Sequence, residues 1–316
     1  MKKIITILFL IFILSSCSTK DAVSKSIYIA SIGFEHNDDG YTGYFLCTSS
    51  VDVGQQKKGN ESSVAKISGD GIIDIFNKFY ESSSLILNYK HISTIILDIS
   101  MLEPDIINSF IDFFIKSNSV DFNFHIFVTD EDINEIFKVK NPNNESSILS
   151  IIIEPIYSEY SYYTAKPIHF LNFSRDYYNN KTIHIPYIEL SDIWDEEKSL
   201  MASGLLFYDE GKKSLLKSNN DFIFLKSFNK LEYNRDNLAV IFTDYKVNID
   251  YKSNKIKITS FYEVINEDIS NEELEKYIKN KINEMIDKLS FVDFLNINYY
   301  NKKYEELSIS INLNKK

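Results

Sequence analysis

The sequence predicts an α+β fold: a mixed α/β, multi-domain chain with β-sheets flanked by helices and a C-terminal part that runs sheet, helix, sheet. Two patterns predict this class. Helical and strand-type spacings alternate closely over residues 71–137, as in an α/β layer. Residues 205–313 instead contain several alternating strands around one long amphipathic segment at 272–289.

The first elements form a predicted hairpin. Residues 27–34 and 41–49 have strand-type patterns, and the segment between them contains Asp39-Gly40, a strong signal of a tight turn. Cys47 lies in the second run, so we interpret it as a small, buried strand residue. A polar loop is expected over residues 53–63.

The next segment changes to helical spacing. A helix is expected to begin after Gly71, and the β-branched run at 92–99 predicts a strand buried on both faces. The apolar face of this helix comprises Ile72, Ile73, Ile75, Phe76, Phe79 and Tyr80.

A second helix and strand follow. Pro104 suits the first turn of a helix, and a further strand is expected at 122–129. Thr129 or Asp130 is expected to cap a third helix at 131–137. The apolar residues of the second helix are Ile106, Ile107, Phe110, Ile111, Phe113 and Phe114.

The middle of the chain is less regular. Residues 141–144 break the pattern, and 147–153 fit either a helix or a strand. The tyrosine-rich segment 157–163 is a candidate for exposed contact with partners. Residues 183–188 contain Pro186, which favours a strand at the edge of a sheet because proline lacks an N–H group.

The last third predicts a hairpin around Asp209-Glu210-Gly211 and a long helix at 272–289 with Ser270 or Asn271 as its cap. Strict alternation at 307–313 predicts a half-exposed final strand. Further strands are expected at 222–225, 239–249 and 256–262.

The division into domains follows from these patterns. We expect a signal peptide at 1–16, a lipidated tether at 17–26, an N-terminal α/β domain at 27–190 and a C-terminal α+β domain at 191–316. A further division near 141–155 is left open. The main boundary is placed beside the charged segment around Trp194.

The first residues carry a targeting signal. Lys2 and Lys3 precede an apolar run at 4–14, which ends in Leu-Ser-Ser-Cys at 14–17. This order is typical of a secretory signal peptide, and the run is too short to span a bilayer well. No later apolar run approaches the length of a membrane span.

The motif that ends this signal resembles a bacterial lipobox. In such a motif the cysteine thiol takes a diacylglycerol, the peptide is cut before the cysteine, and the new amino group is acylated. Cys17 is therefore the predicted lipid-attachment residue, carrying S-diacylglycerol and N-acyl (palmitate) groups. Several acyl chains anchor a protein stably where one binds only marginally. An ordinary signal peptide with a chance cysteine is the alternative.

The composition is that of a globular protein with an acidic body. Loss of Lys2 and Lys3 takes the formal charge from −11 to −13. Such a body is repelled by phosphate-rich partners, so nucleic acid is not an expected partner and the lipid anchor must hold the chain at the membrane. If Cys17 is acylated, Cys47 has no partner for a disulfide.

A search for catalytic and metal-binding motifs found none. The histidines, His36, His91, His125, His169 and His184, have no metal-ligand spacing, and no phosphate loop or nucleophile elbow occurs. The run at 130–134 resembles the start of a calcium loop, but Glu135 stands where the loop needs glycine. Glu35-His36 beside Asp38 and Asp39 is better explained by turn solvation. We therefore expect no enzyme activity, cofactor or metal.

These motifs together resemble one family. The lipobox, the hairpin IASIGFEHNDDGY, the segment SGDGIIDIFNKF and the helix-strand pattern of residues 87–129 are similar to those of the Ger(x)C (GerAC-like) spore germination lipoproteins. The resemblance continues through the hairpin at 204–207 and the helix at 272–289 to the final strand, so it covers nearly the whole mature chain.

The resemblance implies a function. Members of that family are non-enzymatic C subunits of nutrient germinant receptors, anchored by lipid on the extracytoplasmic face of the spore inner membrane. They assemble with A-type and B-type polytopic subunits. The alternative is a solute-binding lipoprotein of a membrane transporter, for which two doubly wound lobes would be expected. A lipid-anchored hydrolase is disfavoured because no nucleophile motif occurs.

Overall fold

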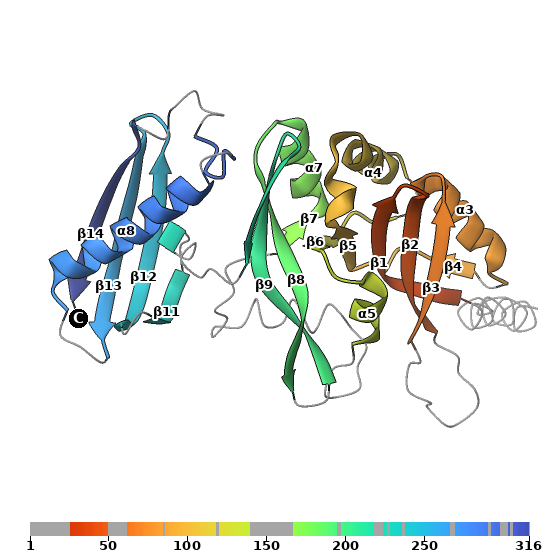
Figure 1. Cartoon of the computed structure of the whole chain (residues 1–316), viewed down its shortest axis with the longest axis horizontal. Coiled ribbons are helices and arrows are strands. Elements are labelled where there is room, and N and C mark those ends of the chain that lie inside the picture. The colour runs from red at the N-terminus through yellow and green to blue at the C-terminus, as the bar shows by residue number, and fades with distance from the viewer. Residues whose placement is uncertain are drawn as a thin grey trace, which may run out of the picture.

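The computed structural model describes residues 26–49, 62–84, 86–117, 120–139, 167–194, 197–217, 224–225, 228–235, 238–265, 269–289, 292–297, 303 and 306–315. Within these ranges the strands form one ten-stranded sheet with several helices packed against it and one four-stranded sheet with one long helix packed against it (Figure 1). The fold is therefore α+β, as the sequence predicts. The predicted signal peptide, Cys17 and the tyrosine-rich segment 157–163 lie outside the described residues, as do 141–144 and 147–153.

The large sheet has the strand order β10-β9-β8-β6-β5-β1-β2-β3, with β4 also beside β1 and β7 also beside β6. The strands β1, β5, β6 and β8 run parallel in its centre. Antiparallel strands complete both sides. The strands are β1 (Ser26–Asn37), β2 (Gly40–Ser49), β3 (Ser62–Gly69), β4 (Ile86–Asn88), β5 (Thr94–Asp98), β6 (His125–Thr129), β7 (Ile168–His169), β8 (Ile183–Trp194), β9 (Glu197–Asp209) and β10 (Lys212–Lys217).

The predicted N-terminal hairpin is confirmed. β1 and β2 pair in antiparallel register up to Asn37 and Gly40, with Asp38 and Asp39 between them. Gly40 has φ +112, a backbone conformation that only glycine adopts readily. A Cβ at this position would also lie 2.8 Å from the carbonyl oxygen of Gly69, so the turn needs glycine for two reasons.

Helices cover both faces of the large sheet. The helices α3 (Ile72–Ser82), α4 (Pro104–Lys116) and α7 (Phe170–Tyr178) pack on one face, and α5 (Ile133–Lys138) packs on the other. A 3-10 turn, η1 (Ile99–Leu102), joins β5 to α4. Pro104 is at the first position of α4, as predicted, because its fixed φ suits that position and no N–H is needed there.

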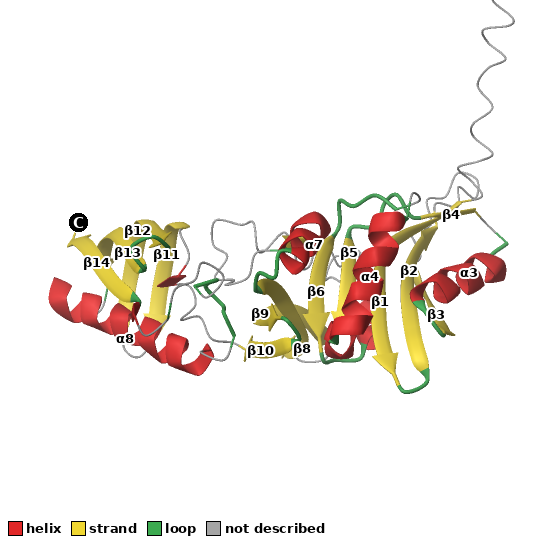
Figure 2. Cartoon of the chain, turned by 90° about the horizontal axis from the view of Figure 1, so that it is seen from above, coloured by secondary structure: helices red, strands yellow, loops and turns green. Residues whose placement is uncertain are grey.

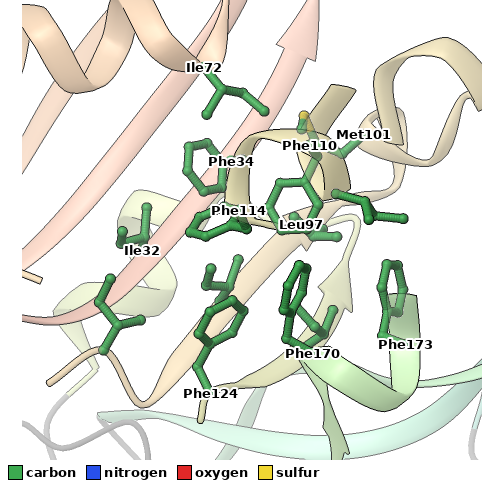
Figure 3. Packing of buried hydrophobic residues seen from close by; sticks show 14 of the residues in the cluster. Ile32, Phe34, Ile72, Leu97, Met101, Phe110, Phe114, Phe124, Phe170 and Phe173 are labelled. Carbon is green, nitrogen blue, oxygen red and sulfur yellow. The ribbon is translucent and has the colours of Figure 1, made fainter. Parts of the chain in front are cut away.

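The core beneath α4 and α7 contains a group of packed phenylalanines, Phe34, Phe110, Phe114, Phe124, Phe170 and Phe173, among aliphatic side chains (Figure 3). Phe114 packs edge-on against Phe34, Phe124 and Phe170, with ring centroids 5.3–6.3 Å apart. Each of these rings is fully buried. Edge-to-face geometry places the positive edge of one ring against the negative face of the next. These pairs therefore stabilise the fold by more than the burial of their apolar area alone.

Two helical predictions need correction. Ile73 and Tyr80 of α3 are 64% and 68% exposed, so the buried face is narrower than predicted. The cap of α5 is Asp132, whose carboxylate accepts from the N–H of Asn134 at 2.8 Å. Thr129 does not cap the helix because it is still in β6, where its hydroxyl donates to the carbonyl of Ile188 at 2.9 Å.

The edge-strand prediction for residues 183–188 is wrong. β8 lies inside the sheet between β6 and β9. Pro186 is tolerated there because the ladder between β8 and β6 is very short, with one described pair, Val128 and Tyr187. The other side of the strand makes a long antiparallel ladder with β9, in which Pro186 faces Leu205.

The small sheet has the order β11-β12-β13-β14, and α8 (Asn271–Leu289) packs on one face. Its strands are β11 (Phe228–Arg235), β12 (Leu238–Asp250), β13 (Lys255–Val264) and β14 (Ser308–Lys315). The predicted long helix and final strand are confirmed, whereas β11 was not predicted. Phe224 and Leu225, predicted in a strand, lie in a short helical turn because Phe224 packs into the core against Tyr233.

The domain boundary expected near residue 191 falls within the β8–β9 hairpin, whose register runs from Ile183 opposite Tyr208 to Trp194 opposite Glu197. The large sheet continues through the predicted hairpin at Glu210 to the end of β10 at Lys217. The two sheets therefore divide after Lys217.

A short loop after α8, residues 292–297, joins the two sheets. Thr182 donates its hydroxyl to the carbonyl of Asp293 at 2.7 Å and its N–H to Asn296 Oδ1 at 2.9 Å. His184 Nε2 donates to the carbonyl of Phe294 at 2.7 Å. On the other side, Phe294 packs in the same buried cluster as the side chains of α8. The loop thus ties the small sheet to the start of β8.

Candidate functional site

The candidate site lies at the edge of the large sheet where β1 begins. The predicted lipid-attachment residue, Cys17, precedes Ser26 by nine residues. At about 3.5 Å per residue, an extended tether of that length reaches roughly 30 Å. If Cys17 carries the lipid, this edge stays near the membrane.

The start of β1 is held on two sides. Ser26 and Tyr28 pair with Ile86 and Asn88 of β4, and the hydroxyl of Thr48 donates to the carbonyl of Tyr28 at 3.3 Å. The start of β1 is therefore fixed to the centre of the large sheet. No helix in the described ranges is both long enough and apolar enough to cross a membrane.

The structure gathers three of the five histidines at this edge. His125 begins β6 and faces His169 of β7 in antiparallel register, and their ring centroids lie 4.0 Å apart. His91 lies in the loop before β5, with its ring 5.4 Å from that of Tyr28. A pocket of about 320 Å³ is lined by all three, together with Lys90, Asp121 and Asn123.

Both ring nitrogens of His125 are buried and have no hydrogen-bond partner within the described ranges. Burial, and then the neighbouring His169 imidazole, lower the pKa of His125 to about 4. The nearby Ser93 carbonyl acts weakly in the opposite direction, and it already accepts the main-chain N–H of His125 at 2.9 Å. The ring is therefore neutral at pH 7, with one donor and one acceptor unused.

Sequence spacing could not predict this cluster. His125 and His169 are far apart in the chain, and the strand pairing that joins them involves a two-residue strand, β7, with no sequence signal of its own. The other two histidines have structural roles. The His36 and Tyr41 ring centroids lie 4.6 Å apart, and His184 makes a hydrogen bond to the loop at 292–297.

The described residues contain no group of three side chains placed to hold a metal ion. The calcium-like run at 130–134 has structural roles: Asp130 accepts a hydrogen bond from the Tyr187 hydroxyl, and Asp132 caps α5. Glu35 accepts from the Tyr44 hydroxyl at 2.8 Å, so it too is engaged in the fold.

Cys47 is a buried strand residue, as predicted, with 6% of its surface exposed. Burial raises the pKa of its thiol to about 11. The thiolate is the reactive form, so this cysteine is poorly placed for nucleophilic or redox chemistry.

Comparison with known proteins identifies the family. A family model described as the spore germination protein N-terminal domain matches residues 21–190, more than half of the chain. The chain belongs to the Ger(x)C family of spore germination proteins. The match covers the described part of the large sheet from β1 to most of β8, including the histidine pocket.

A search of solved structures gave a match described as the crystal structure of the GerBC protein. It covers 90% of this chain and 96% of that chain, at 10% sequence identity and a TM-score of 0.48. No curated protein matches the chain.

Proposed function

We propose that this spore germination family protein is a non-enzymatic, lipid-anchored C subunit of a nutrient germinant receptor. Cys17 holds it on the extracytoplasmic face of the spore inner membrane, and it assembles there with A-type and B-type polytopic subunits. The observation that carries this proposal is the spore germination domain at 21–190, which begins four residues after a lipobox cysteine.

The arrangement of the chain supports this role. The domain is attached through a short tether at one edge of a large sheet, so the anchor limits its height above the bilayer but leaves its helical face open to neighbours. Several large apolar side chains are exposed on that face, including Ile73 and Tyr80 of α3 and Leu171 of α7. These are candidate contacts for the polytopic subunits, because burying exposed apolar surface in an interface is favourable.

The alternative of a solute-binding lipoprotein has less support. Two doubly wound lobes would place a parallel sheet on each side of a ligand cleft. In the part of the chain that the structure describes, only the large sheet has a parallel centre, and the small sheet is antiparallel apart from the β13–β14 pair.

Deletion of the gene in a sporulating host tests the proposal. Spores that lack the protein, and any paralogue with the same domain, are expected to lose nutrient-triggered germination. A chemical trigger that bypasses receptors should still germinate them. Complementation with the native gene should restore the nutrient response, and complementation with Cys17→Ser should restore little of it. A normal nutrient response in the deletion strain would refute the proposal.

A second experiment tests assembly. Membranes from spores that carry an affinity tag on the C-terminus are solubilised in mild detergent and purified through the tag. Polytopic subunits encoded beside the gene are expected to co-purify with the tagged protein. If the tagged protein is recovered without them, the proposed partners are wrong even if germination requires the chain.

A further inference from the structure

The pocket at the starts of β5 and β6 has an unusual set of side chains for an acidic protein. Lys90 supplies a cation, Asp121 an anion, and His91, His125 and His169 supply imidazoles. Lys90, His91 and Asp121 are solvent-exposed, whereas His125 lies deeper and has no partner for either ring nitrogen within the described ranges. One of those nitrogens carries a hydrogen in the neutral ring, so an unused donor lies buried beneath the pocket wall.

A cation is a poor fit to this pocket. The described ranges provide no three ligands for a metal ion, and Lys90 would repel one. An oxyanion fits better, because its oxygens would accept from the ammonium of Lys90 and from imidazole N–H groups. Among the lining residues that the structure describes, Asp121 carries the only carboxylate, and it could meet a positive group on the same ligand.

The place of the pocket indicates where such a ligand comes from. The loops that lead into β5 and β6 lie along the edge of the large sheet from which β1 begins, the edge that also carries β4 (Figure 2). These loops line the pocket. Ile86 of β4, opposite Ser26, is 59% exposed. A tether of roughly 30 Å from Cys17 brings this edge close to lipid headgroups.

We propose that the pocket binds the phosphate of a zwitterionic phospholipid headgroup of the phosphoethanolamine type, with Lys90, His91 and His169 on the phosphate and Asp121 on the ammonium. A headgroup with no net charge suits the whole protein, whose charge of −13 after cleavage opposes anionic lipids. The lipid as the source rests on the proposed anchor at Cys17, whereas the phosphate chemistry of the pocket does not.

The bound phosphate has a consequence for His125. Its oxygens would stabilise the protonated imidazole, so binding raises the pKa of His125 from its value of about 4. The charged and titratable groups that line the same pocket are Lys90, His91, Asp121 and His169.

The test uses a chain that begins at residue 17 and carries Cys17→Ser, which keeps every residue that the structure describes and has no acyl chain. Binding of O-phosphoethanolamine, phosphocholine and inorganic phosphate is followed by histidine side-chain NMR and by calorimetry. Flotation with vesicles of phosphatidylcholine, with and without phosphatidylethanolamine, tests the lipid itself. The variants are Lys90→Gln, Asp121→Asn and His169→Gln.

The proposal predicts saturable binding of phosphoethanolamine that shifts the His125 signals, and stronger flotation with phosphatidylethanolamine. Lys90→Gln should lower the binding affinity for every phosphate ligand at least fivefold. Asp121→Asn should lower the affinity for phosphoethanolamine by a similar factor. The affinity for inorganic phosphate should stay the same or rise slightly. The control is Lys78→Gln, which removes the same charge from an exposed lysine of α3 that pairs with Asp74. This variant should bind phosphate ligands and vesicles as the native chain does.

Three results would overturn the proposal. One is the absence of saturable binding of any phosphate ligand to a chain whose near-ultraviolet circular dichroism shows it to be folded. Another is vesicle binding that is equal in the native chain and in Lys90→Gln. Binding of free phosphoethanolamine without any binding to vesicles would exclude the lipid as the source. Because no acyl chain is present, each result is independent of whether Cys17 is lipidated in the cell.

Discussion

Gly33 of β1 lies so close to Ile133 of α5 that a Cβ on residue 33 would overlap the Ile133 Cγ2 methyl. This contact lets the short helix α5 sit directly on the central strand of the large sheet. Ile133, Ile136 and Phe137 then bury one face of α5 against the sheet. A six-residue helix has little stability of its own, so packing of this kind is what holds it.

Gly33→Ala is therefore expected to destabilise the protein by about 1–3 kcal/mol, because the added methyl must displace Ile133 from a packed core. The free energy of unfolding is measured by urea denaturation. Gly71→Ala is the control for an added methyl: its backbone is extended and a Cβ there meets no atom within 4 Å. Because Gly71 is the N-cap of α3, where alanine is less favourable than glycine, this variant should lose up to about 1 kcal/mol through the cap alone. A change smaller than about 0.5 kcal/mol for Gly33→Ala would show that α5 is free to shift.

The sequence predicted the elements whose local signals agree with their tertiary surroundings. The hairpin at Gly40 and the long helix α8 are of this kind, since turn chemistry in one and apolar spacing in the other point to the same structure. The edge position of Pro186 was predicted wrongly because the rule concerns ladder hydrogen bonds, and the ladder on that side is short. Strand neighbours are a tertiary property that a local pattern does not contain.

The candidate site was less predictable for the same reason. Cys17 was found from a contiguous motif, whereas the His125–His169 pair depends on the antiparallel pairing of β6 with β7. Each histidine by itself stands in an unremarkable segment. Only the register of two strands places their rings 4.0 Å apart.

Thr182→Val tests the loop that joins the two sheets. The variant keeps the shape of the side chain but removes the hydroxyl that donates to the carbonyl of Asp293 at 2.7 Å. Loss of a buried hydrogen bond is expected to cost about 1–2 kcal/mol in the free energy of unfolding. Proteolysis between the sheets, measured under native conditions, should become faster.

The matched control for this change is Thr243→Val in β12. The hydroxyl of Thr243 is buried and has no hydrogen-bond partner within the described ranges, so its removal should be neutral or slightly stabilising. Equal losses of stability in the two variants would indicate that packing, rather than the Thr182 hydrogen bond, holds the loop.

The N-terminus of α8 has a capping box. The hydroxyl of Ser270 accepts from the N–H of Glu273 at 3.3 Å, and the Glu273 carboxylate accepts from the N–H of Ser270 at 3.0 Å. Ser270→Ala is expected to cost about 1 kcal/mol in urea unfolding. Glu273→Gln should retain most of the stability, because an amide oxygen also accepts from the cap; a loss equal to that of Ser270→Ala would contradict this account.

Protonation of His125 is expected to lower the free energy of unfolding at acid pH. The pKa of His125 is about 4 in the folded chain, below the value of about 6.5 expected when unfolded. Between these values the unfolded chain binds a proton that the folded chain does not, so stability present above pH 6.5 is lost as the pH falls towards 4. The ring is partly exposed, so the loss is roughly 1–2 kcal/mol.

His125→Phe should remove that component, because phenylalanine keeps an aromatic ring beside His169 and does not titrate. The measurement is the urea midpoint of both proteins at several pH values from 7 to 4. Parallel curves for the native chain and the variant would show that other groups cause the loss of stability.

The state of Cys17 can be determined by counting thiols, because Cys17 and Cys47 are the only cysteines. Cys47 is buried and its thiol pKa is raised to about 11, so it should react with a thiol reagent only after denaturation. Protein purified from its native membrane is expected to give no fast-reacting thiol when folded and one thiol in urea, since an acylated Cys17 has no free sulfur. The Cys47→Ala variant of the same material should then give none, while the mature chain made without lipidation should give one fast and one slow thiol. Two thiols in the membrane-derived protein would mean that Cys17 is unmodified, and the anchor would have to be sought elsewhere in the chain.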